Sequence, residues 1–255
     1  MELIAALLLG FFFAGYFVLG GADIGLGMLL PYLGREESER QLAVAGVWPV
    51  FLANEVWLVA TAGVFIGCFP ALEGELFSGL VLVLVPLLAG WMIRDAGLWW
   101  GRQAPRAGFW LTVVGSWTLA LSWGWLIASL LTDTPTEPAP PALGAVTSLA
   151  IALLFLAHGM GFAALRLSGV PFERARQVAG RGAGGNSFAL TSAVMFVLPL
   201  LAGARLPLSD SAASDTALRL VVPALLVILP LLLAGQVWLW RTFGRRVEGP
   251  APAYF

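Results

Sequence analysis

Seven long apolar segments run through this sequence, and they decide which solvent the chain can fold in. A helix needs about 20 mostly apolar residues to cross the hydrocarbon core of a bilayer. Of the 255 residues, 59% are hydrophobic and 11% are charged, whereas soluble domains carry about 25% charged residues. The sequence therefore predicts an all-α, polytopic transmembrane bundle that forms a single domain over residues 1–255. The expected spans are Leu3–Leu33, Val44–Phe69, Leu76–Ile93, Phe109–Leu131, Leu143–Leu167, Ser187–Ala204 and Ala217–Phe243.

The positions of the arginines predict the orientation of this bundle. Only Arg205, in the connection after the sixth predicted span, and Arg219, near the start of the seventh, fall on the same side as the N-terminus. Because cytoplasmic loops are rich in basic residues, an outside N-terminus and a cytoplasmic C-terminus are expected. No basic residue precedes the first apolar run, so that run is expected to be a span and not a removed signal peptide. The other arginines, after spans one, three, five and seven, are Arg35, Arg40, Arg94, Arg102, Arg106, Arg166, Arg174, Arg176, Arg181, Arg241, Arg245 and Arg246.

The polar composition excludes several classes of function. A net charge of -1 gives no reason to expect a nucleic-acid partner, which would need a basic face. The sequence has one cysteine, Cys68, and one histidine, His158, whereas metal sites usually need three or four ligands. We therefore expect neither a metal site nor a haem held wholly by this chain. The glycine-rich stretch Gly20–Gly27 lies inside a span without a preceding strand, so a dinucleotide site is not expected either.

Asp23 is the first of two acids within the predicted spans. A charged group near the bilayer centre costs roughly 2.5–3.5 kcal/mol on insertion scales, so such residues face protein or water. Gly21 and Gly25 flank Asp23 at a spacing that lets another helix approach closely. A poorly hydrated carboxyl group favours its neutral form and can relay protons. The other interpretation is a packing site at which Asp23 bonds to a neighbouring span.

Glu55 is the second acid, and it follows Asn54 in the second predicted span. Pro49 should bend or open this helix near its start, because proline removes a backbone donor. Glu55 lies about eleven residues into the predicted span, which argues for a deep position. Either a functional role or a bonded structural carboxylate is compatible with this position.

His158 is the remaining ionisable residue of interest within a span. Histidine can ligate haem iron or move protons. One histidine cannot supply two axial histidine ligands, and no Cys-x-x-Cys-His motif is present. A histidine bonded across helices is the alternative interpretation.

Four stretches together resemble subunit II of the cytochrome bd-type quinol oxidases. They match the order and spacing of that family over about residues 10–180. The first is similar to the family's first-span signature Asp-Gly-x-Asp-x-Gly-x-Gly-Met. The stretches are Gly20-Gly-Ala-Asp-Ile-Gly-Leu-Gly-Met28; Leu33-Gly-Arg-x5-Arg40 leading to Pro49 and Asn54-Glu-Val-Trp57; Arg94-Asp-Ala-Gly97; and Ala157-His-Gly-Met-Gly-Phe162 with Leu165-Arg-Leu-x-Gly169 and Glu173-Arg-Ala-Arg176.

This sequence departs from the family pattern at three points. Gly20 replaces the leading acid of the first signature. Leu52 occupies the position of an acid that is thought to deliver protons, and Glu55, one helical turn later, could substitute for it on the same face. Family members usually have eight spans, so with about seven this chain is expected to be a shortened or divergent member.

The resemblance implies a membrane subunit without haem in a quinol:oxygen oxidoreductase, located in the bacterial cytoplasmic membrane. The partner is a haem-bearing subunit I with b- and d-type haems; a small single-span subunit, lipids and a bound quinone are further expectations. No catalytic residue is expected here. Asp23 and Glu55 are predicted to conduct protons, supported by Asn54, Arg94 and His158, while Gly21, Gly25 and Trp57 are predicted to pack against a partner. Oxygen passage, a purely structural scaffold and a standalone membrane carrier are the alternatives.

Overall fold

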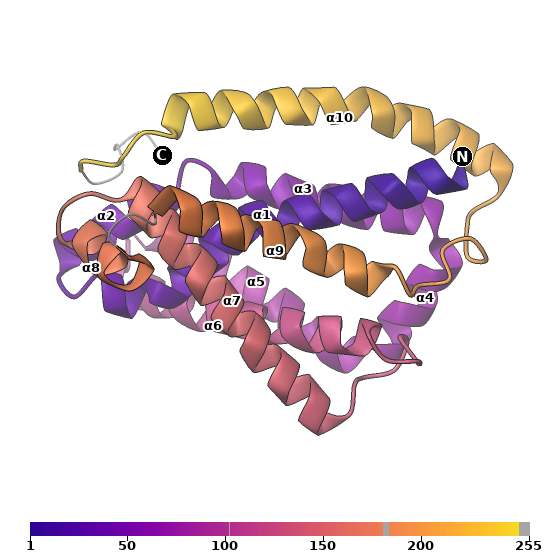
Figure 1. The fold of residues 1–255 in the computed structure, drawn as a ribbon, viewed down its shortest axis with the longest axis horizontal. Helices are drawn as coiled ribbons and strands as arrows, with labels where there is room; N and C mark the ends of the chain where they lie inside the picture. Colours follow the sequence, from indigo (N-terminus) through magenta and orange to yellow (C-terminus); the bar gives the residue numbers. More distant parts are fainter. Residues whose placement is uncertain (102, 181–183, 250–255) are drawn as a thin grey trace.

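The computed structural model describes residues 1–101, 103–180 and 184–249, and all regular elements in these ranges are α-helices. Seven of the helices are long and apolar enough to cross a membrane, which confirms the predicted polytopic helical bundle. The elements are α1 (Glu2–Leu33), α2 (Glu37–Val47), α3 (Phe51–Cys68), α4 (Pro70–Gly79), α5 (Val81–Trp100), α6 (Pro105–Leu130), α7 (Pro141–Arg166), α8 (Gly169–Ala179), α9 (Gly184–Gly203) and α10 (Asp215–Phe243) (Figure 1).

The second predicted span is divided into two helices. Helix α2 ends at Val47 and α3 begins at Phe51, with a turn over residues 48–50 between them. Pro49 lies in this turn, as expected for a residue that cannot donate a backbone hydrogen bond. The prediction that Glu55 lies eleven residues into a span is wrong, because Glu55 is near the start of α3.

The third span is displaced relative to its prediction. Apolar residues from Leu76 onward belong partly to the short helix α4, and the spanning helix α5 extends to Trp100. Arg94, predicted to lie in the connection after this span, is therefore inside α5. A single charged residue does not end a helix when a partner inside the protein compensates its charge.

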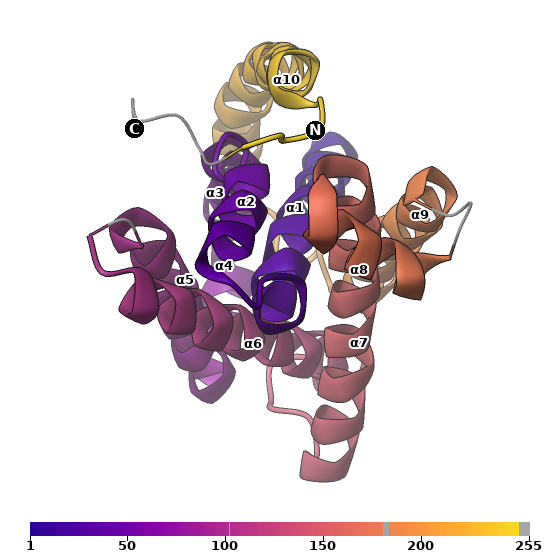
Figure 2. The ribbon, with the colours of Figure 1, turned by 90° about the vertical axis from the view of Figure 1, so that its left-hand side faces the viewer.

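Helix α1 lies at the centre of the bundle and packs against α3, α6, α7 and α9 (Figures 1 and 2). Helix α10 lies along the outside, where it contacts α3 and, to a lesser extent, α1. Large apolar side chains on α10, among them Leu220, Val227 and Leu231, are exposed and form a surface suited to lipid or to another chain. The arrangement thus surrounds α1 with other helices of the chain.

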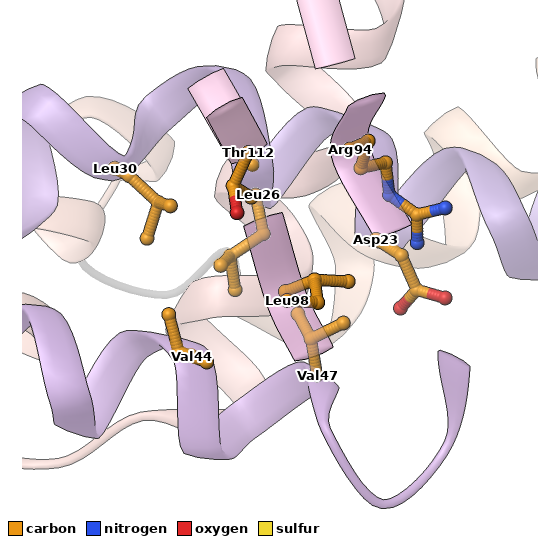
Figure 3. A pocket seen from close by; sticks show the side chains of 9 residues that line it. Asp23, Leu26, Leu30, Val44, Val47, Arg94, Leu98 and Thr112 are labelled. Carbon is orange, nitrogen blue, oxygen red and sulfur yellow. The ribbon is translucent and has the colours of Figure 1, made fainter. Parts of the chain in front are cut away.

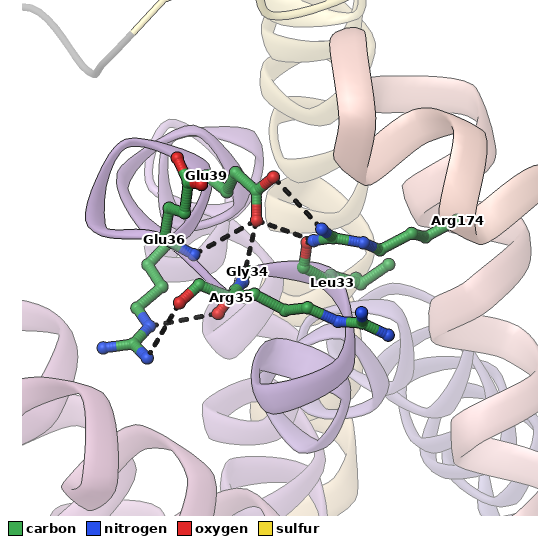
Figure 4. A network of polar contacts seen from close by, with 7 residues as sticks. Leu33, Gly34, Arg35, Glu36, Glu39 and Arg174 are labelled. Carbon is green, nitrogen blue, oxygen red and sulfur yellow. Dashed lines mark hydrogen bonds and ion pairs between the residues drawn. The ribbon is translucent and has the colours of Figure 1, made fainter.

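Several arginines gather at one end of the bundle, beside α2, α8 and the segment after α10 (Figure 1). Arg174 of α8 donates to both carboxylate oxygens of Glu39, at 2.6 and 3.2 Å, and to the carbonyl of Leu33 (Figure 4). Arg174 lowers the pKa of the Glu39 carboxyl group to about 2 by this hydrogen bonding.

Arg166 is the last residue of α7 and is buried, not part of an exposed connection as predicted. Arg102 and Arg181 lie outside the described residues.

Candidate functional site

The site begins at Asp23, in the C-terminal half of the central helix α1. Its side chain is 2% exposed. The side-chain amide of Asn54 on α3 donates to Asp23 Oδ2 at 2.8 Å and to the carbonyl of Leu19 at 3.3 Å. Because the chain turns at Pro49, a new helix, α3, begins at Phe51. Asn54 and Glu55 therefore lie in its first two turns, beside α1. Two residues that the sequence singled out are thus brought into direct contact.

A chain of amides continues from Asp23 to the outermost helix. Gln236 of α10 donates from Nε2 to Asn54 Oδ1 at 2.9 Å, and Trp57 Nε1 donates to Gln236 Oε1 at 3.3 Å. All the donors point in one direction, so that the chain ends on an oxygen of Asp23. Sequence reasoning missed Gln236. A single buried amide in a long apolar helix was the signal that could have revealed it.

A second cluster, ionic in character, lies next to the first. Arg94 Nη1 donates to Glu55 Oε1 at 2.9 Å and to Asp95 Oδ1 at 3.0 Å. Arg94 and Glu55 are 2% and 7% exposed, so this is a buried ion pair between α5 and α3. A buried pair of this kind is costly to break, because removing one partner leaves the other charge uncompensated. Asp95 is a further group that sequence reasoning did not select as a site residue.

Leu52 and Glu55 occupy different environments, although they are one helical turn apart. Leu52 is 51% exposed on the outer surface of α3, whereas Glu55 points inward to Arg94. The expectation that both positions share one face is therefore wrong. A rotation of about 60° between residues i and i+3 is enough to move a side chain from the surface to the interior.

A small cavity separates the two clusters (Figure 3). Asp23, Arg94 and Thr112 supply its polar lining, and Leu26, Val47 and Leu98 contribute apolar walls. About 10 Å³ is open to the centre of a water molecule. The side chains of Asp23 and Arg94 approach each other at this cavity, as Figure 3 shows.

His158 lies on a different side of α1 from the acids. Its Nε2 is 2.8 Å from the carbonyl of Val18, its Nδ1 is 2.8 Å from Thr191 Oγ1, and its ring stacks on Phe188 at 4.6 Å. A carbonyl only accepts, so Nε2 carries a proton and donates. Both ring nitrogens are engaged, and the side chain is therefore unsuited to act as an axial haem ligand. It joins α7 to α1 and α9.

Gly21, Gly25 and Trp57 pack against helices of this chain. A Cβ atom at Gly25 would collide with the backbone of α7, at 2.8 Å from the nitrogen of Gly159. Gly21 faces Phe155 of α7, and Trp57 is buried beside α1. These contacts account for the small residues without a partner chain, and their predicted packing against a partner remains a prediction.

The described residues include no cluster of three or more histidine, cysteine, aspartate or glutamate side chains that could hold a metal ion. Together with the engaged ring of His158, the donor set does not fit a haem. What the arrangement offers is a set of buried carboxyl groups around one guanidinium. Such groups can hold and exchange protons inside an apolar bundle.

Comparison with known proteins places this geometry in context. The family model described as cytochrome bd terminal oxidase subunit II matches residues 1–208. Cytochrome bd ubiquinol oxidase subunit 2 of Bacillus subtilis (strain 168) is 29% identical over 191 residues, which are 68% of this chain and 56% of the relative. Cytochrome bd-I ubiquinol oxidase subunit 2 of Escherichia coli (strain K12) is 28% identical over 134 residues, 51% of this chain and 35% of the relative.

The chain thus spans about half the length of the Bacillus relative, and about a third of the Escherichia relative. The four stretches that suggested the family all lie within the matched residues. Gln236 and the whole of α10 lie beyond them. One residue of the amide chain therefore comes from a part of the protein that the family model does not cover.

Proposed function

Because the chain belongs to the cytochrome bd terminal oxidase subunit II family, we propose that it is the membrane subunit without haem of a quinol:oxygen oxidoreductase complex. The observation that carries the proposal is the family match over residues 1–208, which contain the whole ionic cluster and the Asp23–Asn54 contact. In this complex a larger, haem-bearing subunit I oxidises quinol and reduces oxygen. This chain packs against it within the membrane.

The proposed location is the bacterial cytoplasmic membrane, with the N-terminus outside and the arginine-rich end of the bundle in the cytoplasm. The gathering of Arg35, Arg40, Arg174 and Arg176 at one end supports this orientation. Labelling of engineered cysteines in intact cells tests it, in a background in which Cys68 is replaced by serine. Ser209→Cys should react with an impermeant reagent and Ser38→Cys should not. The reverse pattern would contradict the orientation.

Within this role, we propose that Asp23 and Glu55 carry protons toward the partner. Both carboxyl groups are buried; Glu55 pairs with Arg94, and Asp23 lines the small cavity together with Arg94. Exchangeable carboxyl protons are the property that a proton route needs, and lipid-facing helices around them would keep bulk water away. Asn54 and Arg94 hold these two acids in place, while His158 serves packing.

A purely structural role is the second candidate, and one observation favours it. Glu55 is bonded to Arg94, and Asp23 is bonded to Asn54, as packing groups would be. In that case the acids fix α1, α3 and α5 relative to each other and support the partner's haem site indirectly. Their replacement by neutral residues of the same shape would then leave turnover unchanged in an assembled complex.

Purification through a tag on this chain, followed by a visible spectrum, tests the proposed complex. The expected result is a larger chain that co-purifies, shows haem bands and consumes oxygen when quinol is added. A colourless protein that purifies alone would contradict the proposal and favour a carrier. The conservative variant Leu52→Ile, at an exposed position, serves as a control that should not change the yield of haem.

A further inference from the structure

Two buried polar atoms at the cavity have no hydrogen-bond partner among the described residues. They are Asp23 Oδ1 and Arg94 Nη2. Buried polar groups in folded proteins are almost always paired, either with protein or with ordered water, and an unpaired one costs about 1–3 kcal/mol. Two such atoms beside one cavity therefore require a common explanation.

A direct ion pair does not supply it. Both residues belong to the described part of the chain, yet no hydrogen bond or ion pair joins them there. Asn54 holds the other oxygen of Asp23, and Glu55 and Asp95 hold the other terminal nitrogen of Arg94. Each side chain is thus held through its other terminal atom, and both residues line the cavity.

The donors and acceptors around the cavity match those of one water molecule. Arg94 Nη2 can only donate, and Asp23 Oδ1 accepts when it carries no proton. The hydroxyl of Thr112 donates to the carbonyl of Gly108 at 2.8 Å, so it offers lone pairs to the cavity. A water molecule would accept from Arg94 and donate to Asp23, and two bonds lie within the range of two to four that buried waters make.

From these groups we infer that the cavity is a binding site for a single ordered water molecule that bridges Asp23 Oδ1 and Arg94 Nη2. The space open to a water centre, about 10 Å³, is close to the minimum for one water and too small for more. The site joins the amide chain that reaches α10 to the ionic cluster of α3 and α5. It is a property of this chain alone and holds whether or not protons pass through it.

An ion is excluded from the same site by its surroundings. A metal cation would face the guanidinium of Arg94, and an anion would face Asp23, with Glu55 and Asp95 bound to the same guanidinium. Either charge would meet a group of its own sign in a site of low dielectric constant, where repulsion is strong. A neutral molecule with two donors and two acceptors avoids both conflicts.

A structure of the purified complex at a resolution that shows internal waters tests this inference. The wild type should show one density peak between Asp23 and Arg94. Val47→Ile adds a methylene group to a buried apolar wall of the cavity, and the peak should be lost. Val59→Ile adds the same group at a 60% exposed position of α3, and the peak should remain. An empty cavity in the wild type, among other internal waters that are visible, would overturn the inference.

Infrared spectra give a second readout, and Thr112→Val adds a variant that leaves the packing at Val47 unchanged. In water labelled with oxygen-18, a buried water should give an isotope-shifted O–H stretching band. Thr112→Val keeps the side-chain volume and removes an acceptor, so this band should be shifted or lost. A spectrum that is identical in the wild type, Val47→Ile and Thr112→Val would contradict the inference. These outcomes are independent of turnover, so they do not decide between a proton route and a scaffold.

Discussion

The two faces of helix α1 use opposite means to hold their neighbours. Toward α7, glycine meets glycine: Gly25 lies against the backbone of Gly159, and no side chain intervenes. Toward α3 and α5, Asp23 meets Asn54 and, across a cavity, Arg94. The glycine face is closely packed, whereas the polar face retains polar atoms without partners. The difference indicates that the glycine face holds α1 in place against α7. In our proposal, the polar face carries the proton route.

Filling the glycine face should have the largest effect. Gly25→Ala places a methyl group against the backbone of α7, which cannot move aside as a flexible side chain would. Overpacking of a core costs about 1–3 kcal/mol and more when backbone must shift, so we expect little assembled protein. Gly21→Ala, whose added Cβ would lie 3.1 Å from the ring of Phe155, is the matched control and should assemble. The yield of monodisperse protein by size exclusion checks both, and a normal yield of Gly25→Ala would refute this account of the face.

Breaking the ion pair on the polar face should have the next largest effect. Arg94→Met leaves the Glu55 carboxylate buried without its counter-charge, and such a loss costs about 3–5 kcal/mol. Replacing both residues, as Glu55→Leu with Arg94→Met, should restore part of the melting temperature, because only the less buried Asp95 then lacks its charged partner. The two variants are compared by the thermal stability of the purified complex. If the double variant is less stable than Arg94→Met, the pair does not act as a unit.

Removing the amide from α10 should have a smaller effect. Gln236→Leu breaks its bonds to Asn54 and Trp57, and interhelical hydrogen bonds in membranes contribute about 0.6 kcal/mol on average. We expect α10 to become more accessible to protease while the rest of the bundle stays intact. Val237→Leu, at an exposed neighbouring position, is the control. Equal cleavage rates in both variants would show that Gln236 does not hold α10.

The smallest effect is expected at a site on neither face of α1, the ion pair between Glu39 of α2 and Arg174 of α8. The pKa of Glu39 is lowered from its ordinary value of 4.5 to about 2. Its contribution to stability is therefore present above the ordinary pKa and is lost as pH falls toward 2. The difference in melting temperature between wild type and Glu39→Gln should shrink between about pH 5 and pH 3. Glu37→Gln, 4.0 Å from Arg40, is the control, and a difference that grows on acidification would contradict the assignment.

The sequence predicted the class of fold well and the interior of the site only in part. The spans and the helix break at Pro49 could be predicted, because both depend only on residues that are near in the sequence. The burial of Arg94 could not be predicted. A charged residue indicates a loop unless its partner on another helix is known. Gln236 was missed for the same reason. Leu52 and Glu55 were assigned to one face, but Leu52 is exposed on α3 whereas Glu55 is buried and bonded to Arg94.

The central claim is that the acids of the polar face carry protons, and turnover of a conservative double variant tests it most directly. Asp23→Asn with Glu55→Gln keeps the shape of both side chains and removes both carboxyl groups, while Asp95 still compensates the charge of Arg94. We predict that oxygen consumption with quinol falls by about tenfold or more, in line with the loss of proton-transfer groups, while the haem spectrum of the purified complex is unchanged. Wild-type turnover in a double variant with full haem content would contradict the claim and leave the structural role.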